Sequence, residues 1–171
     1  MVRKKAKKTI NTKALIFIGI AVVGLILAIL GLCTPWITKS SGNLAEGLFA
    51  TFFDDVQKAC ETFKIEIYSI GIVRTFGIIA FVLAIIATAL IVLKTLGIFE
   101  LKGLIKLIVA VAVVVVAVLL LVFAINYVTS LNDVIDKIPS FLGVDFYSMG
   151  IASFLLPIGT ATTGVAYLLN K

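Results

Sequence analysis

The chain has 171 residues, of which 61% are apolar, and its mean hydropathy is +1.21. A soluble domain is only about half apolar, and a chain this short could not hide so much hydrocarbon in one small core. This composition excludes an ordinary soluble protein. Lys and Arg exceed Asp and Glu by 15 to 9, which gives a net charge of +6, and the chain contains no His.

Four charge-free windows are each long enough to cross a bilayer as a helix, which takes about 20 apolar residues. We therefore predict an all-α membrane protein, a left-handed bundle of four transmembrane helices. The predicted spans are residues 14–35, 70–93, 104–126 and 148–169, within one domain over 14–171, and the outer loops are 36–69 and 127–147. The first span starts like a signal peptide but is long and lacks a small-x-small cleavage site, so we expect it to be retained.

The charges outside the spans predict the orientation. The basic tail, residues 1–13, carries six cations, and Lys94, Lys102 and Lys106 lie between the second and third charge-free windows, Thr75–Leu93 and Leu107–Asn132. Eight of the nine acids lie in the two longer loops. Because Lys and Arg mark the cytoplasmic side, we expect both termini in the cytoplasm and the protein in the plasma membrane. The basic charge would attract anionic lipid headgroups rather than nucleic acid.

Small residues recur along the spans at alternating steps of three and four residues. Helices in lipid associate through close packing at such residues, and a seven-residue repeat favours left-handed crossings. Pro157 lacks a backbone donor and should kink the fourth span. The residues expected at helix contacts are Gly24, Ala28 and Gly31 in the first span, Gly77, Ala80 and Ala84 in the second, and Gly150, Ser153, Pro157 and Gly164 near or in the fourth.

Groups that carry chemistry are missing from the spans. No ionisable Asp, Glu, Lys, Arg or His stands in the middle of any of the four, whereas proton relays and ion-coupled transporters need such groups at depth. The sequence also has no Cys-x-x-Cys pair, metal-ligand cluster or nucleotide-binding loop. We therefore expect no enzymatic activity, no cofactor and no metal.

The first outer loop contains three strand-like pieces: 36–38, 48–53 and 63–68, the last of which alternates apolar with polar residues. Ser40–Asn43 predicts a turn between the first two. We expect a small extracellular antiparallel sheet between the first two spans. Since a few short strands are not stable alone, the sheet must lean on the bundle. Trp36 would fix its foot at the membrane interface.

A set of residues follows in order along this region: Trp36, then Glu46-Gly47-Leu48-Phe49, then Cys60, then Arg74. This pattern resembles the claudin superfamily, which includes the peripheral myelin and epithelial membrane proteins. Its signature is a Trp, a Gly-Leu-Trp and two Cys in the first extracellular loop, with an Arg where the second helix begins. The resemblance implies a claudin-like fold whose sheet anchors are Trp36, Glu46, Gly47, Leu48, Phe49 and Arg74.

Two positions depart from this pattern. Phe49 stands where the family has its second Trp, and no Cys lies near Phe52, where the first would fall. Cys60 therefore lacks its usual partner, and Cys33 at the outer end of the first span is the one other cysteine. A Cys33–Cys60 disulfide would be worth about 3–4 kcal/mol. The alternatives are two inert thiols, or a loop held by packing alone.

The second outer loop has apolar residues at helical spacing, which predicts an amphipathic extension of the third span. Pro139 would end it, and its apolar face would pack on the sheet, with the membrane surface or a partner as the alternatives. The apolar residues are Val128, Leu131, Val134, Ile135 and Ile138.

Proteins of the claudin build generally act by association rather than by chemistry. The resemblance thus implies a structural or organising membrane protein that binds itself or neighbouring proteins through its outer loops and helix faces. An auxiliary subunit of a larger channel, transporter or receptor is the alternative. A small channel or transporter in its own right is disfavoured by the missing charges at depth.

Overall fold

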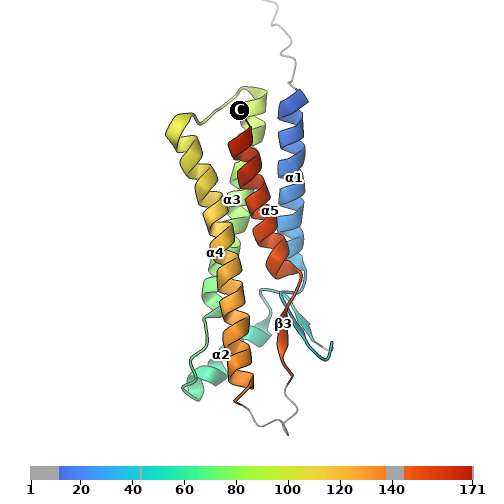
Figure 1. Cartoon of the computed structure of the whole chain (residues 1–171), viewed down its shortest axis with the longest axis vertical. Coiled ribbons are helices and arrows are strands. Elements are labelled where there is room, and N and C mark those ends of the chain that lie inside the picture. The colour runs from blue at the N-terminus through green and yellow to red at the C-terminus, as the bar shows by residue number, and fades with distance from the viewer. Residues whose placement is uncertain (1–11, 43, 138–144, 171) are drawn as a thin grey trace, which may run out of the picture.

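The computed structural model describes residues 12–42, 44–137 and 145–170. Its frame is four long helices that run side by side (Figure 1), each long and apolar enough to cross a membrane. They are α1 (Thr12–Cys33), α3 (Ile70–Leu96), α4 (Gly103–Ile135) and α5 (Ala152–Leu169). The prediction of a mostly helical, multi-pass membrane protein with four spans is confirmed.

The two ends of the bundle carry different structures (Figure 1). One end carries three short strands and the helix α2 (Thr51–Thr62), and we call it the sheet end. At the opposite end, which we call the termini end, α1 begins, α5 ends and residues 97–102 link α3 to α4. Four crossings thus bring both ends of the helical frame to the same side. Of the predicted basic tail, residues 1–11 lie outside the described residues.

The helix α5 lies at the centre of the packing. Its mean hydropathy of 1.4 is the lowest of the four, yet 56% of its membrane-length segment is buried, against 22–33% in the other helices. It contacts α1, α3 and α4, and α3 also contacts α1 and α4. Between α5 and α3 the Thr160 hydroxyl donates to the Ala80 carbonyl at 3.3 Å. Because its neighbours shield it from lipid, α5 tolerates more polar residues than they do.

Small residues lie where the helices approach one another most closely. A methyl group added to Gly24 would lie 2.8 Å from the carbonyl oxygen of Gly159, and one added to Gly31 would lie 2.5 Å from the backbone nitrogen of Leu156. Only glycine permits so close an approach of α1 to α5. The predicted residues found buried are Gly24, Ala28 and Gly31 in α1, Gly77, Ala80 and Ala84 in α3, and Ser153, Pro157 and Gly164 in α5.

The helix α5 continues through Pro157 without interruption. A kink at this proline and the left-handed twist of the bundle stay predictions.

The sheet is antiparallel, with its strands in the order β2-β1-β3. The strands are β1 (Ile37–Lys39), β2 (Ala45–Glu46) and β3 (Tyr147–Met149). The chain turns after β1 at the predicted Ser40–Asn43, of which Asn43 lies outside the described residues; the Gly42 N–H donates to the Lys39 carbonyl at 2.8 Å. Gly42 has a φ of +74°, which glycine adopts without strain.

The third strand does not come from the first outer loop. It immediately precedes α5 and pairs with β1, with Met149 opposite Ile37. The prediction that the sheet lies wholly between the first two spans is therefore wrong. The fourth span also begins at Ala152 rather than near residue 148, because Tyr147–Met149 is used as a strand.

Two of the strand-like pieces in the first loop are not strands. The piece predicted over 48–53 contains a turn and then the first residues of α2. The apolar side chains of this segment follow a helical spacing of three and four residues, at Phe53, Val56 and Cys60. This spacing favours a helix over the strand that the short apolar run suggests. The piece predicted over 63–68 leads into α3 as irregular chain, since no strand of the described chain pairs with it.

The predicted extension of the third span is confirmed. The helix α4 runs to Ile135, past the expected end at residue 126, and buries Leu131 on the face towards the sheet. The Asn132 side chain exchanges two hydrogen bonds with the backbone of Tyr147 in β3, at 2.8 and 2.9 Å. The extension of α4 therefore lies beside β3. What covers its apolar face stays a prediction. The predicted stop at Pro139 lies outside the described residues.

The close approach of α1 to α5 predicts a sharp difference between two glycines of α1. Gly31→Ala should destabilise the protein by about 1–3 kcal/mol, because the new methyl group collides with the backbone of Leu156. Gly19→Ala is the matched control, since open space surrounds that position. Thermal unfolding followed by circular dichroism in mild detergent measures both. Equal melting temperatures for the two variants would contradict the packing described.

Candidate functional site

Arg74, near the start of α3, fastens the sheet end to the bundle. Its Nε–H donates to the Leu48 carbonyl at 2.9 Å, one terminal nitrogen donates to the Ala50 carbonyl at 2.7 Å, and the other forms a salt bridge with Asp54 of α2. Its guanidinium carbon lies 6.0 Å from the ring centre of Phe53. The planar fork of guanidinium donors suits this set of acceptors. One side chain thus joins α3 to both the chain before α2 and its first turn.

Trp36 and Leu48 form the buried base of the sheet end. Trp36 is 3% exposed, and its indole N–H donates to the carbonyl of Gly31 in the last turn of α1 at 2.7 Å. Leu48 is fully buried against α3, where a methyl group added to Gly77 would come within 2.9 Å of it. Trp36 therefore fixes the foot of the sheet, but from inside the protein rather than as a ring at the membrane interface.

The other predicted anchors contribute less. Glu46 acts through its backbone, whose carbonyl accepts the Trp36 N–H at 2.7 Å. Gly47 has open space around its Cα, so nothing there requires a glycine for packing. Phe49 is 53% exposed and does not anchor the sheet. The base of the sheet end therefore depends on Trp36, Leu48 and Arg74.

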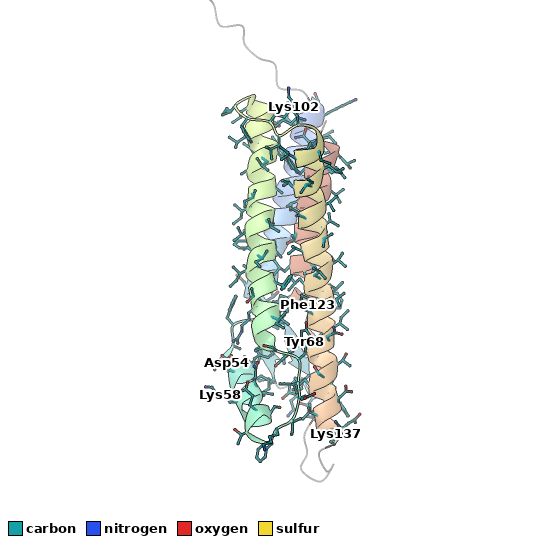
Figure 2. The ribbon with its side chains drawn as sticks, turned by 90° about the vertical axis from the view of Figure 1, so that its left-hand side faces the viewer. Asp54, Lys58, Tyr68, Lys102, Phe123 and Lys137 are labelled. Carbon is teal, nitrogen blue, oxygen red and sulfur yellow. The ribbon has the colours of Figure 1, made fainter. Side chains whose placement is uncertain are left out.

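Sequence reasoning missed the polar contacts on the side of α4. The Ser130 hydroxyl accepts the Tyr68 N–H at 3.1 Å, and the Tyr68 ring stacks on Phe123 with centroids 5.8 Å apart. Figure 2 shows Tyr68 and Phe123 next to one another between α3 and α4. These contacts hold the chain between α2 and α3 against α4. The signal that could have found them is a polar residue, such as Ser130 or Asn132, inside an otherwise apolar helix.

Both cysteines are free thiols, so the Cys33–Cys60 disulfide is not formed. Cys33 is exposed at the end of α1, whereas Cys60 is buried in α2. Burial raises the pKa of the Cys60 thiol, which disfavours the reactive thiolate. Cys60 therefore behaves as a small apolar side chain.

An apolar groove of about 290 Å³ lies between α2 and the sheet-end extension of α4. Its lining offers almost no hydrogen-bonding atoms, so it suits an apolar group of a ligand or partner. The lining residues are Phe52, Val56, Ala59, Cys60 and Phe63 from α2 and its end, Ile65 beyond it, Leu131, Val134 and Ile135 from α4, and Tyr147 from β3.

The end of α2 holds Phe63 at the lip of this groove, where its side chain is 75% exposed. Lys64 follows with a φ of +56°, and the N–H groups of Lys64 and Ile65 donate back to the carbonyls of Glu61 and Cys60. This is a Schellman ending, which usually takes a glycine at the position of Lys64. A costly backbone conformation thus turns the chain sharply directly after the exposed Phe63.

No group of three or more His, Cys, Asp or Glu residues that could hold a metal occurs within the described chain. Comparisons with protein-family models, with curated proteins and with solved structures find no match to this chain. The resemblance to the claudin superfamily therefore stays a prediction.

The Arg74 contacts predict how the sheet end fails. Arg74→Lys keeps the charge but cannot bond to Leu48, Ala50 and Asp54 together, so we expect a loss of about 1–2 kcal/mol and faster amide exchange over residues 50–54. Asp54→Asn is the control: it removes the charge pair, which is part-exposed, and keeps both carbonyl contacts. Hydrogen–deuterium exchange by mass spectrometry compares them. Exchange no faster in Arg74→Lys than in the wild type would show that Arg74 is not the fastener.

Proposed function

We propose that the chain is a claudin-like organising protein of the membrane, which acts by binding other membrane proteins or copies of itself through its sheet end. The observation that carries this proposal is the apolar groove beside α2, with the exposed ring of Phe63 at its lip. Exposed aromatic surface of this kind is characteristic of a protein-binding site when it faces water.

The lengths of the helices support a position of this groove outside the bilayer. The helix α4 has 33 residues, or about 50 Å at 1.5 Å per residue, whereas the hydrocarbon core is about 30 Å thick. Charged residues gather at the sheet end, among them Asp54, Asp55 and Lys58 on α2 and Asp133 on α4. The extra length therefore stands in water, and Phe63 with it.

The basic residues support an extracellular sheet end. Lys94, Lys102 and Lys106 lie at the termini end and the acids of the long loops lie at the sheet end. Since positive residues mark the cytoplasmic side, the termini end faces the cytoplasm and the groove opens outside the cell.

The claudin resemblance gains support from the way its signature residues meet. Trp36, Leu48 and Arg74 are far apart in the sequence, yet all three converge on the base of the sheet end. The contact of α5 with α3 across the bundle also favours association over conduction, because it fills the centre of a single chain.

The first test is to extract the protein into native nanodiscs, determine the mass of the particle and identify everything that co-purifies. A homo-oligomer would support self-association, and a larger protein at fixed ratio would make the chain an auxiliary subunit. A single chain with no companion would contradict the proposal.

A pair of variants then tests the groove itself. Phe63→Ser should leave folding unchanged, because the ring is largely exposed. It should weaken the affinity for the companion protein or the second copy at least tenfold, as expected for an aromatic hot spot. Phe49→Ser is the matched control, an exposed aromatic that does not line the groove. Equal retention of the companion by both variants would place the contact elsewhere on the protein.

A further inference from the structure

The termini end carries a patch of positive charge around the link from α3 to α4. Lys94 lies in the last turn of α3, Lys102 immediately before α4, and Lys106 in the first turns of α4. The one acid in this link, Glu100, forms a salt bridge with Lys94 at 2.9 Å. This hydrogen bond, with the charges of Lys102 and Lys106, lowers the pKa of Glu100. One carboxylate thus faces three ammonium groups.

Two of these lysines are held in place by the end of α5. The Nζ groups of Lys94 and Lys106 both donate to the backbone carbonyl of Asn170, each at 2.7 Å. The Lys106 ammonium also lies 5.7 Å from the ring centre of Tyr167. These contacts place positive charge at the negative end of the α5 dipole. The cations are therefore fixed near one another instead of spreading apart.

Lys102 is exposed, and no hydrogen bond or ion pair within the described ranges engages its ammonium. Figure 2 shows it at the far end of the bundle from Asp54 and Lys58 of α2. Apolar side chains surround it in the sequence and are about half exposed or more: Ile98, Phe99, Leu104 and Ile105. A cation set among exposed apolar side chains fits the boundary between lipid headgroups and acyl chains.

We propose that this patch is a binding site for the headgroup of an anionic phospholipid. The lysine ammonium groups meet the negatively charged headgroup, and the apolar side chains of Ile98 and Leu104 lie among the acyl chains. A free phosphate ion in water would leave those side chains without contact, so the charged and the apolar parts of the patch together select a lipid. This inference rests on the patch alone and is independent of the function proposed for the sheet end.

The test uses the full chain in micelles of phosphatidylcholine and detergent, with phosphatidylglycerol added in steps and its binding counted by native mass spectrometry. Lys102→Gln should weaken phosphatidylglycerol binding about fivefold, and salt should weaken it further in the wild type. Because the Lys102 ammonium is exposed and makes no hydrogen bond or ion pair within the described residues, this change should leave the melting temperature nearly unaltered. Lys58→Gln, exposed on α2, is the matched control and should bind as the wild type does.

Two further measurements sharpen the outcome. Lys106→Gln should weaken lipid binding and also lower the melting temperature, because it loses the contact with Asn170. Inorganic phosphate at the same concentrations should not displace phosphatidylglycerol. Displacement by phosphate would show that the patch binds free anions. Equal lipid affinity in Lys102→Gln and the wild type would show that the patch is not a lipid-binding site. Either result overturns the proposal.

Discussion

The backbone contact between α1 and α5 is the constraint on which the rest of the structure depends. It begins where Gly24 meets Gly159 and continues where Gly31 meets Leu156. Beyond the helices the same line of contact reaches Gly150, where any side chain would collide with the carbonyl of Pro35. The Gly150 N–H then donates to the Trp36 carbonyl at 2.7 Å, beside the pairing of β1 with β3. The register of the sheet is thus set by glycines, several of which lie inside the membrane-length helices.

The two ends of the molecule are built by different means. At the sheet end, Arg74 bonds to two carbonyls and a carboxylate, so one long side chain of α3 holds both α2 and the turn before it. At the termini end the arrangement is reversed, because two lysines from α3 and α4 converge on a single carbonyl of Asn170. In both places a cationic side chain donates hydrogen bonds to backbone carbonyls of another element.

The spans and their small-residue faces could be predicted from the sequence because each rests on a local property, hydropathy or a period within one helix. The third strand could not, since Tyr147–Met149 is short and its pairing with Ile37–Lys39 joins residues over a hundred positions apart. The helix α2 was missed although its period is readable, because Leu48–Phe53 is apolar enough to suggest a strand. Of the proposed anchors, Trp36, Leu48 and Arg74 are buried or hydrogen-bonded, whereas Phe49 is exposed. No local sequence pattern distinguishes the buried anchors from the exposed Phe49.

Trp36 is the only tryptophan of the chain, and its ring is buried with the indole N–H bonded to Gly31. Its fluorescence therefore reports on a single joint, the one between the last turn of α1 and the sheet. An unfolding experiment read by emission would follow the detachment of the sheet end, whereas circular dichroism would follow the four long helices. A transition at lower temperature by emission than by circular dichroism would show that the sheet end unfolds before the bundle does.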